Sequence, residues 1–321
     1  MKAALLGVIA GILLGIQASP SSTLEVSSGG QSVMPETCTL RLETPDGRLP
    51  SPAVVMLVDP ALPASPSHDW LNELETAYLE AGFAVLAIQR PHGNTTSIRQ
   101  QADEVAAAID ELQHNPRIEP ARIGIWGVGG AGAWLGSQVA RDSPDLAFMV
   151  LVSAPMETPE IFRLRATGQR LLEVSQLPEP VVDRITRFQS ARWDYLDTGV
   201  GYEKLVAELG DLRQKEWFPT SGLPQRIRPA AERDHLPADL RVFLVNRHLD
   251  PLENLSRIST PLLAIYGDRD ATMPAAEFAV KLHFLASALD KDLTVRTHAG
   301  LDHELMRVSP DSKLPGSIDP E

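Results

Sequence analysis

The chain has 321 residues, of which 43% are hydrophobic and 22% are charged. This length and composition fit a globular protein with one large core, or a core that carries an insertion. The formal net charge is −13, and a surface of that sign repels phosphate backbones, so we expect no nucleic-acid partner.

Residues 1–18 have the layout of a secretory signal peptide. One lysine precedes an apolar run from Ala3 to Ile16, and small residues follow, with Ala18 the last before the expected cleavage point. The alternative is a membrane anchor, but the run is shorter than the roughly 20 residues that span a bilayer. We therefore expect an exported protein, periplasmic or secreted, without a stable membrane span in the mature chain.

Residues 19–36 are rich in serine, glycine and proline, which predicts a flexible segment. Beyond them, short apolar runs typical of strands buried on both faces of a parallel sheet alternate with amphipathic stretches typical of helices. This alternation predicts an α/β fold with right-handed crossovers. In chain order, the expected elements are strand 53–58, helix 69–82, strand 83–89, helix 95–115, strands 122–128 and 147–153, strand 261–267, helix 273–290 and strand 293–298.

One long segment, residues 156–255, interrupts this rhythm. It contains amphipathic helical runs, many prolines and two tryptophans, but no clear alternation of strand and helix. We interpret it as a helical cap inserted between two strands of the sheet. The expected core then comprises residues 37–155 and 256–310, followed by a C-terminal tail at 311–321.

A glycine-rich stretch, IGIWGVGGAGAW, has two interpretations. Gly127, Gly129 and Gly132 match G-x-G-x-x-G, a spacing that can cradle a dinucleotide pyrophosphate. Such a fingerprint normally follows the first strand of its unit, and an acidic residue ends the next strand. Here the glycines follow the third expected strand and the next one ends in LVSAP, without an acid. We therefore expect no nucleotide and no other cofactor.

The second interpretation is a strand that turns sharply into a helix. The passage RIGIWGVGGAGAWLGSQVA resembles the nucleophile elbow of the α/β-hydrolase superfamily, with Gly129 at the position of the nucleophile. The segments YGDRD and GLDH resemble the family's acid and histidine segments, in the family's order, and the cap resembles that of secreted bacterial esterases and peptidases. The resemblance covers about residues 40–308. It implies an α/β-hydrolase fold with an inserted cap, and a retained dyad of Asp270 and His303, with Asp268 the alternative acid.

Two departures from the family's pattern concern catalysis. Glycine at position 129 adopts the left-handed backbone of the elbow without a Cβ penalty, but it has no oxygen with which to form an acyl-enzyme. The resemblance implies that Pro60 occupies the position of the family residue whose backbone N–H helps to bind the oxyanion. Proline has no N–H to donate. A shifted register, with another loop amide as donor, is the alternative. The amide of Gly130 remains as the second donor.

These features lead to three hypotheses. The first is a degenerate, non-catalytic or weakly catalytic homologue that binds a small acyl-type ligand or a protein partner. The second is an active hydrolase that uses water activated by the dyad, or a substitute nucleophile at Ser153 or Ser137. The third is non-hydrolytic proton abstraction by the dyad. The histidines show no metal-ligand spacing such as H-E-x-x-H, so we expect no metal.

Overall fold

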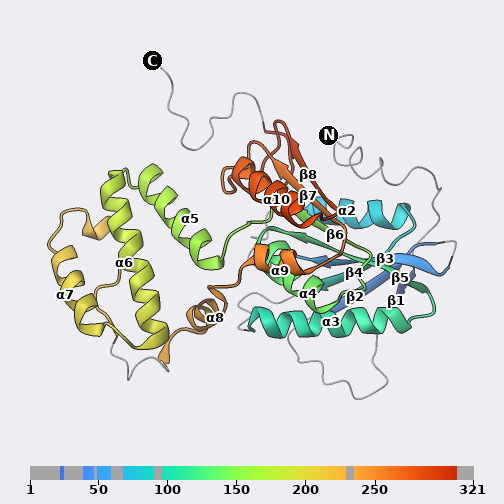
Figure 1. The fold of residues 1–321 in the computed structure, drawn as a ribbon, viewed down its shortest axis with the longest axis horizontal. Coiled ribbons are helices and arrows are strands. Elements are labelled where there is room, and N and C mark those ends of the chain that lie inside the picture. The colour runs from blue at the N-terminus through green and yellow to red at the C-terminus, as the bar shows by residue number, and fades with distance from the viewer. Residues whose placement is uncertain are drawn as a thin grey trace. The chain divides into compact units, whose positions relative to one another are not determined.

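The computed structural model describes residues 22–24, 39–46, 49–58, 68–89, 96–228 and 235–308 (Figure 1). The predicted signal peptide, the C-terminal tail and Pro60 lie outside these residues. The described chain forms two compact units: a sheet unit that ends at Met156 and resumes at Asp250, and a helical unit over Glu157–Leu249. In the described part of the chain, no helix is both long enough and apolar enough to cross a membrane.

The sheet unit is built on one sheet with the strand order β1-β2-β4-β3-β5-β6-β7-β8. The pairs β1–β2 and β2–β4 are antiparallel, and the remaining neighbours are parallel. In chain order the strands are β1 (Ser22–Leu24), β2 (Thr39–Thr44), β3 (Ser51–Leu57), β4 (Ala84–Gln89), β5 (Ile118–Val128), β6 (Phe148–Val152), β7 (Leu262–Gly267) and β8 (Leu293–His298). All six predicted strands are present, in a largely parallel sheet as predicted.

Two strands differ from the expectation. Ser22–Leu24 lies within the segment predicted to be flexible, yet it pairs with β2. The β2 sequence, TLRLET, alternates apolar and polar residues, unlike the continuous apolar runs of the parallel strands. Both additions lie on the antiparallel side of the sheet, where a strand needs less apolar sequence because it need not be buried on both faces.

Helices cover both faces of the sheet. They are α2 (His68–Glu80), α3 (Ile98–His114), the π-helical turn η1 (Ala131–Gly136), α4 (Ser137–Asp142), α9 (Pro251–Arg257) and α10 (Ala275–Leu289). Trp70 and Leu74 of α2 pack in one apolar cluster with Met56 of β3. The neighbouring Leu57 approaches η1 at Gly136. Because successive strand residues point to opposite faces, α2 and η1 lie on opposite sides of the sheet.

The helical unit contains α5 (Pro159–Glu173), α6 (Glu179–Thr198), α7 (Tyr202–Leu212), the short 3₁₀ turn η2 (Phe218–Thr220) and α8 (Ala238–Asn246). Its apolar core is centred on α6, whose Phe188, Trp193 and Tyr195 side chains are buried. Trp217 is partly buried against the same cluster. Arg247 is also buried, and it forms ion pairs with Glu160 at 2.8 Å and with two aspartates of α6. The unit therefore has its own core and its own buried ion-pair network.

The end of the insertion differs from the predicted residue 255. Helix α9 belongs to the sheet unit, because Asn254 donates to Ser137 Oγ of α4 and accepts a hydrogen bond from Arg141. Asp250 caps this helix by accepting from the backbone N–H of Leu252 at 2.9 Å. In sequence, α9 cannot be distinguished from the helical segment before it, because it is short and has no long apolar stripe. Only its packing against α4 assigns it to the sheet unit.

Candidate functional site

The candidate site begins at the turn that follows β5. Gly129 has φ of +54°, in the left-handed region that glycine adopts without the penalty a Cβ would carry. Gly130 then has right-handed helical angles and starts the helical turn η1. Its amide lies in the first turn of the helix, where backbone N–H groups have no intrahelical acceptor. The strand, the left-handed turn and the helix are those that the elbow interpretation predicts.

The two other glycines of the G-x-G-x-x-G pattern allow the strand and the helix to cross closely. A Cβ on Gly127 would lie 2.5 Å from Gly132 Cα, and a Cβ on Gly132 would lie 2.6 Å from the carbonyl oxygen of Gly127. Each of the three glycines therefore has a local backbone reason to be there. The pattern needs no dinucleotide to explain it.

Asp270 and His303 meet at the carboxyl ends of β7 and β8. His303 Nδ1 lies 2.7 Å from Asp270 Oδ2. The other carboxylate oxygen, Oδ1, accepts from the backbone N–H groups of Thr272 and Met273 at 2.8 and 3.0 Å, and from Thr272 Oγ1 at 2.7 Å. The Asp270 side chain is fully buried and the His303 side chain is about one quarter exposed. The carboxylate is thus fixed on one side by the backbone and orients the imidazole on the other.

The surroundings of Asp270 favour its charged form. Burial alone would raise the pKa of this carboxyl, but the hydrogen bond and charge of His303, together with the hydrogen bonds from Thr272, lower it below its ordinary value. Asp270 therefore stays ionised and accepts hydrogen bonds from the ring on one side and from the 272–273 turn on the other.

Asp268, the alternative acid, lies elsewhere. Its Oδ1 accepts from the backbone N–H of Gly300 at 2.6 Å, so it fastens the start of the loop that carries the histidine. In the part of the chain that the structure describes, it forms no hydrogen bond with His303. The two aspartates therefore have different contacts: Asp268 binds the backbone of the loop that carries His303, and Asp270 contacts the imidazole ring of His303.

A close backbone approach at Gly267 fixes the position of the His303 loop. A Cβ at this glycine would lie 2.2 Å from the carbonyl oxygen of Leu301 and 2.5 Å from that of Asp302. The next turn adds a direct tie, because Arg269 N–H donates to the Leu301 carbonyl at 2.9 Å. The loop that bears His303 therefore rests directly on the end of β7.

His303 also faces the elbow. A Cβ built on Gly129 would lie 3.7 Å from His303 Nε2, and it would meet no other non-neighbouring atom of the described residues within 4 Å. The imidazole thus has Asp270 at its Nδ1 side and Gly129 at its Nε2 side. Gly129, His303 and Asp270, which are far apart in the sequence, come together with the imidazole between the glycine and the carboxylate.

Among the described residues, neither of the two serines considered as substitute nucleophiles forms a side-chain hydrogen bond with Asp270 or His303. Ser153 is completely buried with φ of +46°, and its Oγ has no hydrogen-bond partner among the described residues. Ser137 is also completely buried, and its Oγ accepts from Asn254. Because a nucleophile needs both a base within hydrogen-bond reach and access to the substrate, these serines do not fit the role in this structure.

Thr272 and Gly267 belong to the site and are missing from the sequence prediction. The hydroxyl of Thr272 lies 2.7 Å from Asp270 Oδ1 and 3.1 Å from His303 Nδ1. An aspartate followed two residues later by threonine is a pattern typical of side-chain-to-backbone turns, and this signal could have found Thr272. Pro60 lies outside the described residues, so its predicted effect on the oxyanion site stays a prediction. In the described part of the chain, no group of three or more potential ligand side chains could hold a metal ion.

We expect Asp270→Asn to lower the free energy of unfolding by about 2 kcal/mol at pH 7, because hydrogen bonds to a charged group are lost. The folded-state pKa of Asp270 is lowered, so its contribution is present above the unfolded-state pKa and is lost as the pH falls through the folded-state value. Urea unfolding from pH 7 to pH 3 should show the difference between the native and variant proteins shrinking below about pH 4.

Asp268→Asn is the matched control, because Asp268 is exposed and accepts one hydrogen bond, from Gly300. It should cost less than 1 kcal/mol. Equal losses in the two variants, or a difference that grows in acid, would contradict the assignment of Asp270 as the buried, ionised partner of His303.

No family model matches the chain, and no curated protein matches it in sequence. Among solved structures, the chain is similar to the α/β-hydrolase GrgF from Penicillium sp. sh18, at 16% identity over 89% of this chain and 91% of that one, with a TM-score of 0.51. It is similar to DcsB in complex with its substrate analogue, at 14% identity over the same shares, with a TM-score of 0.50. A 2,6-dihydroxy-pseudo-oxynicotine hydrolase matches at 16% identity over 95% of this chain and 67% of that one, with a TM-score of 0.49.

At these identities the likeness concerns the fold. The sheet order, the parallel pairing from β4 to β8 and the turn after β5 agree with it. The chain therefore has the α/β-hydrolase fold.

Proposed function

We propose that this is an exported protein of the α/β-hydrolase fold whose site has lost covalent catalysis and now binds a small acyl-type ligand with little or no turnover. The observation that carries the proposal is the approach of His303 Nε2 to Gly129. The base is aimed at the position where a nucleophile would stand, and that position has no side chain. Without an oxygen there, no acyl-enzyme can form at the elbow.

Esterase assays and active-site labelling test the proposal. The mature protein should hydrolyse p-nitrophenyl acetate and p-nitrophenyl butyrate at close to the uncatalysed rate, and a fluorophosphonate probe should not label it. His303→Ala should leave both results unchanged. Rapid turnover that depends on His303, or stoichiometric labelling of any serine, would overturn the loss of covalent catalysis.

Binding is tested separately from turnover. A non-hydrolysable acyl analogue, such as a p-nitrobenzyl ketone of matching chain length, should bind the mature protein saturably in calorimetry. A Gly129→Trp variant, which fills the space before His303, should abolish this binding. Binding that is unaffected by this substitution would place the ligand elsewhere and contradict the proposed site.

A second function is favoured by the completeness of the dyad. Asp270 accepts hydrogen bonds from the backbone of the 272–273 turn as well as contacting His303, which is more than a vestigial pair requires. A neutral imidazole held in this way can act as a general base toward water, which is worth about a hundredfold to ten-thousandfold in rate. This function predicts ester hydrolysis without labelling and without a burst, falling by that factor in both His303→Ala and Asp270→Asn.

A further inference from the structure

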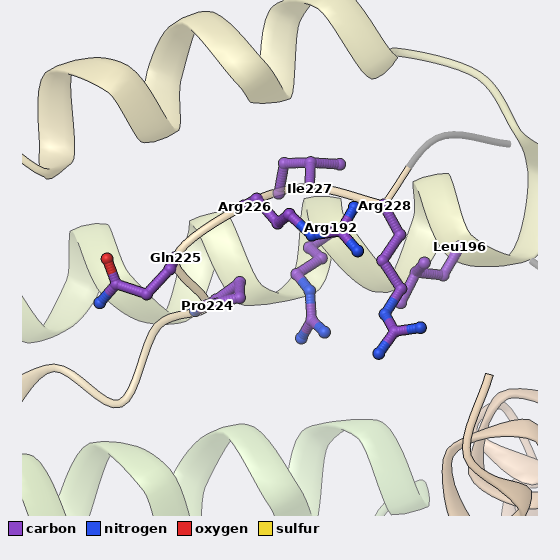
Figure 2. Close-up of a pocket in the computed structure, with 7 residues that line it drawn as sticks. All are labelled: Arg192, Leu196, Pro224, Gln225, Arg226, Ile227 and Arg228. Carbon is purple, nitrogen blue, oxygen red and sulfur yellow. The ribbon is translucent and has the colours of Figure 1, made fainter. Parts of the chain in front are cut away.

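The helical unit contains a cavity of about 250 Å³ between α6 and the segment 224–228 (Figure 2). Arg192 and Leu196 of α6 form one side of it. Pro224, Ile227 and Arg228 contribute from the segment. The cavity therefore combines an apolar surface with guanidinium groups, within a single compact unit and apart from the residues of the dyad.

Two guanidinium groups of this cavity extend in the same direction. Figure 2 shows the Arg192 and Arg228 side chains pointing to the same side, from the helix and from the segment respectively. Both side chains belong to half-buried residues. Within the described ranges no carboxylate forms an ion pair with either of them, and Arg192 donates to the neutral amide oxygen of Gln189, in the amide orientation that satisfies both groups. Among the described residues, these two positive charges therefore have no acidic partner where they line the cavity.

Arg226 also lines the cavity, and Arg163 adds further positive charge beside Arg192. The guanidinium of Arg163 lies over the ring of Phe243, 4.6 Å from its centroid, and 5.9 Å from that of Trp193. Burial lowers the pKa of Arg192 below its ordinary value, and the charges of Arg163 and Arg228 lower it further. Three like charges held together in this way repel one another, which disfavours the free form of the site.

The acidic side chains of the same helix are engaged elsewhere. Asp194 and Asp197 of α6 lie 2.9 and 3.2 Å from Arg247, which also pairs with Glu160. Among the residues of the unit that the structure describes, carboxylates thus pair with the buried Arg247 and none pairs with Arg192 or Arg228. This contrast within one helix suggests that the counter-charge of the cavity comes from a ligand.

We propose that this cavity binds a small organic anion, a carboxylate carried on a short apolar chain. Guanidinium groups present paired N–H donors that match the two oxygens of a carboxylate. The apolar side chains of Leu196, Ile227 and Pro224 suit a hydrocarbon body, which inorganic phosphate lacks. The cavity is smaller than the pockets of roughly 300–1,000 Å³ that hold drug-sized ligands, so the body is short. The inference uses no residue of the dyad and is independent of the proposed function.

Calorimetric titration of the full chain with hexanoate, inorganic phosphate and hexanol tests this site. Hexanoate should bind saturably, phosphate more weakly, and hexanol not measurably. Arg192→Gln and Arg228→Gln should each weaken hexanoate binding at least tenfold. Arg187→Gln removes a positive charge from an exposed position of the same helix and should leave binding unchanged.

The free variants should remain folded, because removal of one guanidinium relieves repulsion within the cluster. Their melting temperatures without ligand should be equal to or above that of the native protein, whereas the gain in melting temperature on adding hexanoate should be lost. Absence of saturable hexanoate binding, equal binding of hexanol, tighter binding of phosphate, or unchanged affinity in both arginine variants would each overturn the proposal.

Discussion

Gly129→Ser should give a protein that is labelled by a fluorophosphonate and hydrolyses p-nitrophenyl esters at least a hundredfold faster than the native chain. A Cβ at this position lies 3.7 Å from His303 Nε2, so a hydroxyl on that Cβ comes within hydrogen-bond reach of the imidazole. Asp270 already holds the other side of the ring at 2.7 Å. The substitution therefore completes a serine, histidine and aspartate arrangement by adding one hydroxymethyl group.

The substitution also has a cost in stability that a control isolates. Gly129 has φ of +54°, and a residue with a Cβ in this region costs about 1 kcal/mol or more. Gly129→Ala has the same backbone cost but no hydroxyl, so it should be destabilised to the same extent and stay inactive. The double variant Gly129→Ser/His303→Ala should also stay inactive. Activity in either control would mean that the gain does not come from a serine activated by His303.

Comparing labelling with turnover shows whether a deficit of Gly129→Ser lies in the nucleophile or in the oxyanion site. If Gly129→Ser is labelled but turns over esters slowly, the deficit lies in stabilising the oxyanion, as the predicted position of Pro60 implies. Removal of one oxyanion donor typically costs roughly 3 to 4 kcal/mol of transition-state stabilisation. If the variant is neither labelled nor active while remaining folded, the arrangement of Gly129, His303 and Asp270 is not a catalytic frame, and the proposed origin of the site is wrong.

The sequence is sufficient to predict the parallel part of the sheet. Its strands are continuous apolar runs, and most of the segments between them have the apolar spacing of amphipathic helices. The resemblance to the α/β-hydrolases implies the segments that carry Gly129, Asp270 and His303, and the sheet explains why they meet, since each follows a strand and the carboxyl ends of parallel strands share one edge. The choice between Asp268 and Asp270 could not be made on this basis. Both follow β7, and only the three-dimensional position of the His303 loop separates them.

Features that depend on tertiary packing could not be predicted. Gly267 is inconspicuous in the sequence because its role is defined by carbonyl oxygens of residues more than thirty positions away. The same reason hides the cavity of the helical unit: Arg192 and Arg228 are separated by the end of α6, by α7 and by η2, and the arginines form no cluster in the sequence. The sequence also does not reveal that α9 belongs to the sheet unit, because that assignment depends on a tertiary hydrogen bond between Asn254 and Ser137.

Gly267→Ala should lower the free energy of unfolding by about 3 kcal/mol and, in the Gly129→Ser background, reduce ester hydrolysis by about a hundredfold. The new Cβ would lie 2.2 Å from the carbonyl oxygen of Leu301 and 2.5 Å from that of Asp302. These are backbone atoms, which cannot rotate away as a side chain could, so the loop that carries His303 must move. A displacement of about 1 Å in a catalytic group is enough for a loss of this size.

Urea unfolding measures the first effect, and ester hydrolysis with fluorophosphonate labelling, both in the Gly129→Ser background, measures the second, with Gly82→Ala as the reference substitution. Gly82 has φ of +85°, and a Cβ there would meet no non-neighbouring atom of the described chain within 4 Å. Gly82→Ala should therefore cost about 1 kcal/mol through its backbone alone and leave labelling intact. If Gly267→Ala is no worse than this reference and labels equally fast, the contact between the end of β7 and the 301–302 carbonyls does not position His303. A larger loss in both measurements would mean that the site depends on this backbone contact as well as on the side chains of the dyad.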